Sequence, residues 1–192
     1  MKKYSIVTYL EGQAKQAVRN IQQELFEITG SRECLDTWSP HLTVGNGIEV
    51  SEEQMSDLEK VIAKFTESQA GFNVELSGFG GLDNRVGGKG EVTTPFVLWV
   101  GVVVNEQLRK LVQEIEQTIT SQCELWYKMP LPYTPHVTVA FRDLSKEGYQ
   151  SGLTYLNDKN FSGTVSVSHI ALVEKLPDTD IEYKRFEFGR PT

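Results

Sequence analysis

Two seven-residue segments, 38–44 (WSPHLTV) and 133–139 (YTPHVTV), repeat one pattern of residue types. Each holds an aromatic residue, a hydroxyl residue, Pro, His, an aliphatic residue, Thr and Val, and four of the seven positions are identical. The chain has three histidines, and two of them lie in this repeat. Imidazoles transfer protons near neutral pH, and hydroxyl groups donate hydrogen bonds to oxygens that gain negative charge. A pair of each therefore indicates acid–base chemistry at a phosphorus centre.

The two segments have the residue types and the alternation of β-strands. They are rich in β-branched residues, and in a strand the residues two apart share a face. His41 and Thr43 therefore point to one side while their aliphatic neighbours point into a core, and the same holds for His136 and Thr138. The proline in each copy stands where a strand begins, a position that tolerates a missing N–H. We expect two imidazoles and two hydroxyls to converge on a groove between two similar halves.

The paired His-x-Thr motifs, 95 residues apart (136 − 41), resemble the two-histidine (2H) phosphoesterase superfamily. This superfamily includes the bacterial RNA-ligase-like and cyclic phosphodiesterase proteins, and the resemblance covers nearly the whole chain in layout. It implies a metal-independent phosphodiesterase without a cofactor, acting on a cyclic or RNA-end phosphodiester of a nucleotide. His41 and His136 would be the general acid and base, and Thr43 and Thr138 would bind the phosphoryl oxygens.

Two other functions remain open at this point. Joining of RNA ends through a 2′-5′ bond is the same chemistry run backwards, so the same four residues would serve. A non-catalytic nucleotide-binding module could keep the motifs as a ligand clamp, although binding alone does not require two titrating groups. The sequence does not say which histidine is the acid and which is the base.

Arg142 is the candidate for a substrate phosphate contact. In an unbroken strand it would share the face of His136 and Thr138. Members of the superfamily that the motifs resemble often carry a basic residue shortly after the second motif, although the spacing here is one residue off the common pattern. Trp38 and Tyr133 could stack a base, but we interpret them as hydrophobic anchors of the motif strands.

The glycine-rich stretch 78–90 and His169 are weaker candidates. The stretch has neither the P-loop nor the dinucleotide-binding pattern, which favours a surface loop over a rim that brings Arg85 or Lys89 to a phosphate. His169 shares the parity of apolar residues in a strand predicted over 164–173, so we expect a partly buried, hydrogen-bonded histidine rather than a catalytic one. Neither His-x-x-x-His nor Cys-x-x-Cys occurs, and no metal site is expected.

The hydrophobic periodicity predicts an α+β fold. Apolar residues at helical spacing predict four helices, over 12–29, from Ser51 to Phe65, from Asn105 to Ile119, and over 145–156. Besides the two motifs, strands are predicted over 4–10, 72–76, 94–104, 164–173 and 181–188. The order strand, helix, motif strand, helix, strand occurs twice. We therefore predict one bilobal domain over 1–192, pseudo-twofold symmetric, with two antiparallel sheets lining a central cleft, helices outside, and lobes that need not be contiguous in sequence.

The composition limits the partners. The net charge of −7 argues against a basic face for long nucleic acid and favours a small nucleotide or a single RNA end. Two cysteines, Cys34 and Cys123, are too few for a disulfide framework and indicate reduced thiols. The first apolar run ends at Glu11, too early for a signal peptide, and no stretch is long enough to span a membrane. We expect a cytoplasmic monomer.

Overall fold

A computed structural model of the chain describes residues 1–83, 96–122, 133–176 and 179–189. The strands are β1 (Lys2–Tyr9), β2 (His41–Val50), β3 (Phe72–Asp83), β4 (Phe96–Val103), β5 (His136–Ala140), β6 (Ser162–Val167), β7 (His169–Lys175) and β8 (Asp180–Glu187). The helices are α1 (Gly12–Thr29), α2 (Glu33–Asp36), α3 (Glu52–Glu67), α4 (Glu106–Gln122) and α5 (Lys146–Asn157). The predicted α+β class with helices outside is confirmed.

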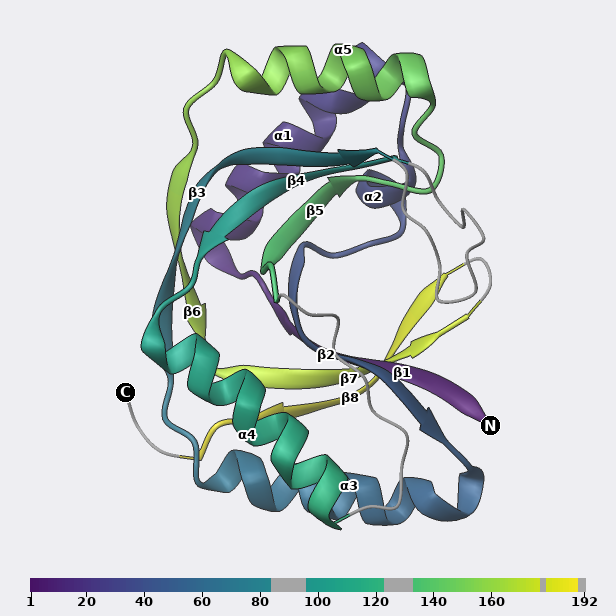
Figure 1. Ribbon diagram of the computed structural model, residues 1–192, viewed down its shortest axis with the longest axis vertical. Coiled ribbons are helices and arrows are strands. Elements are labelled where there is room, and N and C mark those ends of the chain that lie inside the picture. Colours follow the sequence, from purple (N-terminus) through teal and green to yellow (C-terminus); the bar gives the residue numbers. More distant parts are fainter. Residues whose placement is uncertain (84–95, 123–132, 177–178, 190–192) are drawn as a thin grey trace.

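The described strands form one curled sheet in which every neighbouring pair is antiparallel (Figure 1). Their order is β6-β3-β4-β5-β2-β1-β7-β8. The two predicted sheets are the two halves of this sheet, and they join where β2 pairs with β5 through Leu42 and Val137. The two motif strands are therefore the central neighbours of the sheet.

Each half of the sheet draws strands from both halves of the chain. β3 lies beside β4 and β6, whereas β7 and β8 return to β1. The helices are exchanged in the same way: α1 follows β1 but packs with α5 against the half that contains β5, while α4 follows β4 but packs with α3 against the half that contains β2 (Figure 1). The two central strands, β2 and β5, are therefore flanked by strands and helices from both halves of the chain.

Local sequence determines most helix ends as predicted. α1 has the predicted bounds and ends at Gly30, which has the positive φ of 75° that glycine adopts without strain. α3 begins at the predicted capping box, in which Ser51 and Gln54 bond to each other's backbone N–H. The Asn105 side chain accepts the N–H of Leu108 at 2.8 Å, as expected of the residue that caps α4.

Two predicted strands had wrong bounds, and one short helix was not predicted. β3 continues to Asp83 after an irregularity near Gly78, so the start of the predicted glycine-rich loop is strand. Arg85 and Lys89 lie outside the described residues. The strand predicted over 164–173 is two strands, because the chain leaves β6 at one edge of the sheet and enters β7 in the other half at Ser168. Helix α2, only four residues long, carries no periodicity that would predict it.

Candidate active site

The structure brings His41, Thr43, His136 and Thr138 onto one face of the sheet. Leu42 pairs with Val137, so these two side chains point to the same side, and the residues flanking them in each strand point to the other side. The aliphatic residues of both motifs are buried in the core: Leu42, Val44, Val137 and Val139. The histidines and threonines are half-buried on the opposite face, as the alternation predicted.

The register gives the arrangement of the four groups. Continued by one residue from the Leu42–Val137 pair, it sets Thr138 opposite His41 and His136 opposite Thr43. The two histidines then lie on a diagonal, for which the usual separation of Cα atoms is about 7–8 Å. The two imidazoles therefore project from neighbouring positions on the same face of the sheet.

Both imidazoles are oriented by the same local bond. Nδ1 of His41 lies 2.9 Å from the carbonyl oxygen of Ser39, and Nδ1 of His136 lies 2.8 Å from that of Thr134. A carbonyl oxygen only accepts, so Nδ1 carries the hydrogen in both rings. In the neutral ring Nε2 therefore has the free lone pair, and in the charged ring Nε2 has the transferable proton. The repeat produces two equally oriented acid–base groups.

The aromatic residues of the motifs hold the strands in place, as interpreted from the sequence. The Tyr133 hydroxyl donates to the backbone carbonyl of Thr43 at 2.9 Å, which joins the second motif to the first. Trp38 is only 8% exposed and packs against Phe141 and His41. Neither side chain presents a freely exposed ring to a base.

The surroundings of His41 favour its neutral form. Burial lowers the pKa of His41, the nearby Lys175 ammonium and His136 lower it further, and the hydrogen bond to Ser39 and the charge of Asp180 oppose this change. His41 and Thr43 line a cavity of about 380 Å³ whose other walls come from β1, β7, β8 and the start of α1. His41, with its pKa lowered mainly by burial, therefore lies at the edge of a cavity.

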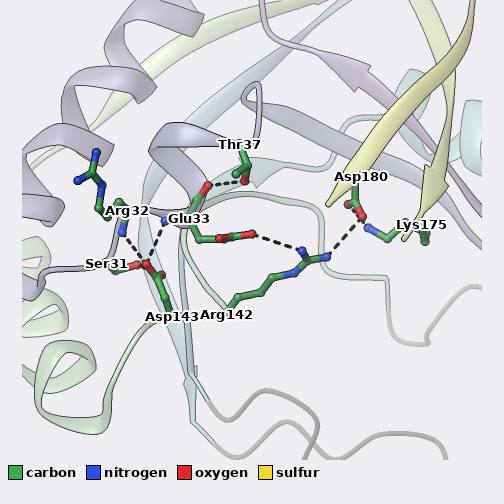
Figure 2. Close-up of polar contacts among 8 residues, drawn as sticks. All are labelled: Ser31, Arg32, Glu33, Thr37, Arg142, Asp143, Lys175 and Asp180. Carbon is green, nitrogen blue, oxygen red and sulfur yellow. Dashed lines mark hydrogen bonds and ion pairs between the residues drawn. The ribbon is translucent and has the colours of Figure 1, made fainter. Parts of the chain in front are cut away.

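Arg142 does not continue the motif strand. β5 ends at Ala140, and Arg142 has a positive φ of 62°, so the parity on which its predicted position rested does not apply. Its guanidinium lies 3.4 Å from Glu33 and 3.4 Å from Asp180, and 4.7 Å from the centre of the Trp38 ring (Figure 2). Asp180 also pairs with Lys175 (Figure 2). Arg142 therefore reaches the cavity wall through Asp180 and Trp38, with its charge already paired.

Asp143, the next residue, ties the second motif to the segment that precedes the first. Its carboxylate accepts hydrogen bonds from the Ser31 hydroxyl at 2.6 Å and from the backbone N–H groups of Arg32 and Glu33 at 2.8 and 3.1 Å (Figure 2). The two backbone N–H groups lie at the start of α2, where the first N–H groups of a helix have no partner within the helix. The connection after β5 thus fixes the connection before β2.

Sequence reasoning missed three neighbours of the histidines. Tyr9 is the register partner of His41, and the centres of the two rings lie 6.1 Å apart. The ammonium of Lys175 lowers the pKa of His41. Trp99 lies 5.1 Å from the His136 ring, and a Cβ at Gly80 would lie 2.6 Å from the Trp99 ring. The parity of Tyr9 with Val7 in the first strand could have indicated its face. Nothing local could have indicated Lys175 or the Gly80–Trp99 contact, because both depend on strand pairing.

The expectation for His169 is confirmed. It is 1% exposed, and its Nε2 accepts the backbone N–H of Tyr9 at 3.2 Å. Among the described residues, no group of three or more His, Cys, Asp or Glu is arranged to hold a metal ion. No helix in the described ranges is long and apolar enough to cross a membrane.

The arrangement has the parts required for displacement at phosphorus. Two imidazoles with outward-facing Nε2 atoms can remove and supply protons on either side of a phosphoryl group, and two hydroxyls can donate to its non-bridging oxygens.

Comparisons with known proteins identify the family and the fold. The family model described as "2'-5' RNA ligase superfamily" matches residues 47–179. No curated protein sequence matches the chain. Among solved structures, the protein TT0787 of Thermus thermophilus has a TM-score of 0.69 at 18% identity, covering 97% of this chain and 98% of that one.

Two further structures show the same fold. The E. coli protein LigT, solved in complex with 3'-AMP, has a TM-score of 0.64 at 19% identity, covering 98% of this chain and 99% of LigT. A protein described as a phosphoesterase has a TM-score of 0.63 at 19% identity, covering 99% and 100%.

Proposed function

We propose, from the premise that this chain belongs to the 2'-5' RNA ligase superfamily, that it is a metal-independent phosphodiesterase. Its substrate would be a cyclic or RNA-end phosphodiester of a nucleotide. His41 and His136 perform general acid–base catalysis, and Thr43 and Thr138 bind the phosphoryl oxygens. A phosphate contact from Arg142 would require its guanidinium to leave Glu33 and Asp180. The main support is the placement of both motifs on adjacent strands and one face, with their imidazoles held in the same tautomer.

The reaction with a ribose 2′,3′-cyclic phosphate illustrates the roles. A water molecule attacks phosphorus while His41, the neutral imidazole, accepts its proton at Nε2. The bond between phosphorus and one ribose oxygen breaks, and His136 supplies a proton to that oxygen from its own Nε2. Thr43 and Thr138 donate hydrogen bonds to the non-bridging oxygens as charge grows on them. The product is a phosphomonoester, and proton exchange with water restores both histidines.

The test is hydrolysis of nucleoside 2′,3′-cyclic phosphates by the purified chain in excess EDTA. We expect turnover to a monoester at an unchanged rate, because proton transfer and oxygen binding come from side chains. Loss of activity with EDTA that a divalent ion restores would overturn the metal-independent mechanism. Binding without turnover would instead support a nucleotide-binding module.

A second candidate function is 2′-5′ ligation, which the description of the matched family names. In this reaction a 5′-hydroxyl replaces water as the nucleophile: one histidine accepts its proton, the bond between phosphorus and O3′ breaks, and the other histidine supplies a proton to O3′, so the same four residues would join a 2′,3′-cyclic phosphate end to a 5′-hydroxyl end. Incubation of two such RNA fragments at high concentration, followed by digestion with a nuclease specific for 3′-5′ bonds, distinguishes the two functions. A nuclease-resistant junction would show ligation, and the accumulation of monoester ends alone would show hydrolysis.

A further inference from the structure

Four charged side chains of alternating sign follow one another beside the first motif: Glu33, Arg142, Asp180 and Lys175 (Figure 2). The guanidinium of Arg142 lies 3.4 Å from the carboxylate of Glu33 and 3.4 Å from that of Asp180. Asp180 also pairs with the ammonium of Lys175. The Asp180 side chain is only 8% exposed, whereas the other three are between 23% and 34% exposed. One buried carboxylate is therefore shared by two cations.

This charged cluster joins parts of the chain that lie far apart in the sheet. Arg142 follows β5, whereas Asp180 begins β8, and the strands β2, β1 and β7 separate β5 from β8 in the sheet order. Lys175 and Asp180 are register partners at one end of the β7–β8 pair. The ion pair of Arg142 with Asp180 therefore connects the half of the sheet that contains the second motif with the edge of the half that contains the first.

The two cations of the cluster both contact the ring of Trp38, the first residue of the first motif. The guanidinium carbon of Arg142 lies 4.7 Å from the centre of this ring, and the ammonium of Lys175 lies 5.1 Å from it. At such distances a cation is attracted to the face of an indole. The buried Trp38 ring lies 5.7 Å from the centre of the His41 ring. Asp180 therefore holds both cations that contact the ring packed against His41.

Charged and titratable groups from several elements surround His41. Lys175 of β7 and His136 of β5 lower its pKa, and Asp180 of β8 raises it. Tyr9 of β1 is neutral near pH 7, because burial raises its pKa to about 12. Two cations and two carboxylates lie further along the cavity wall, where the arginine pairs with both carboxylates: Lys15, Arg185, Glu11 and Glu182. Asp180 is the carboxylate that pairs with Lys175 and opposes its effect on His41.

We propose that Asp180 is a positioning residue for the reaction: its carboxylate holds Arg142 and Lys175 against the Trp38 ring and so fixes the packing of His41 on that ring. The same carboxylate balances the charge of Lys175 beside His41. Asp180 acts through these neighbours and does not contact the reacting atoms. This inference rests on the proposed function, in which His41 is the general base, and adds to it a residue outside both motifs.

The first experiment measures the pKa of His41 by NMR, from the imidazole carbon shifts of the full chain over a pH series, with His41→Gln to assign the signal. Asp180→Asn keeps the shape of the side chain and removes its charge. We expect the pKa of His41 to fall in this variant, because Lys175 keeps its charge without the carboxylate that balances it. Asp57→Asn removes an exposed carboxylate that pairs with Lys60 on α3 and should leave the pKa of His41 unchanged.

A second pair of variants tests Asp180 in a chain without the ammonium of Lys175. Lys175→Met should raise the pKa of His41, and the double variant of Lys175→Met with Asp180→Asn should have a lower His41 pKa than Lys175→Met alone. This comparison decides the question even if Asp180→Asn alone does not fold, because no ammonium then loses its partner. A pKa of His41 that responds to neither removal of the Asp180 charge would overturn the inference.

The second experiment separates positioning from a purely structural role. With a nucleoside 2′,3′-cyclic phosphate, Asp180→Asn should lower kcat by about ten- to a hundredfold and leave KM nearly unchanged, because the substrate still binds while the imidazole is displaced. The acid limb of kcat/KM should move to lower pH together with the pKa of His41. Asp180→Glu keeps the charge and should recover most of the lost kcat. Equal losses of kcat in Asp180→Asn and Asp180→Glu, with an unmoved acid limb, would overturn the inference.

The NMR titration separates this inference from the proposed function, because it requires no substrate. The expected pKa changes, in a wild-type chain that hydrolyses no cyclic phosphate, would support the role of Asp180 at His41 and reject the hydrolytic function. Hydrolysis by a wild-type chain in which neither the pKa of His41 nor kcat responds to Asp180→Asn would do the reverse.

Discussion

At the scale of single residues, the repeated motif supplies both the reactive groups and their orientation. Each histidine bonds through Nδ1 to the carbonyl two residues before it. Seven residues therefore suffice to present Nε2 of one imidazole beside a threonine hydroxyl. The pairing of the two strands converts two such units into a set of four.

The first prediction concerns the imidazoles themselves. General acid–base catalysis by a positioned side chain contributes roughly 10²–10⁴-fold, so His41→Ala and His136→Ala should each lower kcat by about that factor. The threonine variants Thr43→Val and Thr138→Val keep the β-branched shape and should cost at most about 10²–10³-fold. Hydrolysis of a nucleoside cyclic phosphate and thermal unfolding of the same samples test this. A histidine variant with wild-type turnover would make the repeat structural.

The second prediction is the pH dependence of activity. Burial and Lys175 lower the pKa of His41, and the base must be neutral. Activity should therefore be present above the pKa of His41 and fall as the pH drops through it, at a value below the ordinary 6.5. A pH profile of kcat/KM measures this acid limb. Lys175→Met removes a cation that lowers this pKa, so the limb should move to higher pH; a limb unmoved in this variant would contradict the role of His41 as base.

At the scale of helices and strands, the connections between elements hold the site together. Asp143 follows β5 and caps the short helix before β2, and Tyr133 before β5 bonds to Thr43 within β2. These contacts link the flanks of one motif to the other. They fix the relation between the motifs, which pair directly only at Leu42 and Val137.

The third prediction tests that link. Asp143→Ala leaves the donors at the start of α2 without their acceptor, and loss of a helix cap costs about 0.5–2 kcal/mol of unfolding free energy. Urea denaturation measures the change. Asp57→Ala is the matched control, because Asp57 is 73% exposed and pairs with Lys60 on the surface of α3. The control should stay within about 0.5 kcal/mol of the wild type. If the two variants were equally stable, the Asp143 carboxylate would not stabilise the start of α2.

The sequence predicted elements where local chemistry decides and failed where pairing decides. Helix α1 follows from its apolar stripe and Gly30, and the motif strands follow from alternation and proline. The break at Ser168 did not, because the sequence on both sides of it is typical of a strand and only the strand partners differ. In the site, the four motif residues were predictable from the repeat. Parity could have indicated the face of Tyr9, but the positions of Trp99 and Lys175 were not predictable, since the pairing of strands distant in sequence brings them there.

At the scale of the whole molecule, the exchange of strands between the halves makes one crossing point important. The chain passes from β6 to β7 at Ser168, whose carbonyl accepts the N–H of Phe188 at 2.8 Å. His169 comes next, and its Nε2 accepts the backbone N–H of Tyr9, the residue paired with His41. A buried histidine thus connects the crossover to the strand beside the candidate active site.

The last prediction follows from the charge of His169. Burial is the main cause that lowers its pKa; Arg185 also lowers it, while Glu187, Glu11 and Glu182 raise it. A protonated Nε2 cannot accept a hydrogen bond from the Tyr9 N–H. His169 therefore binds a proton less readily in the folded chain than in the unfolded chain, where its pKa is about 6.5. Where the unfolded state holds more protons, the free energy of unfolding rises with pH. The stabilisation that neutral His169 gives to the folded chain is therefore complete above about pH 6.5. It is lost as the pH falls from about 6.5 to the lowered pKa of His169.

Urea denaturation at intervals from about pH 7.5 to 5 measures this loss, and the range stays above the ordinary pKa values of carboxyl groups. His169→Gln retains an acceptor oxygen for the Tyr9 N–H but does not titrate, so its stability should fall less over this range than that of the wild type. His41→Gln, which removes a second histidine whose pKa is lowered by burial, should also reduce the slope, and the double variant should reduce it further. If His169→Gln kept the full wild-type slope, the acid sensitivity would come from other groups, and His169 would be a packing residue at the crossover.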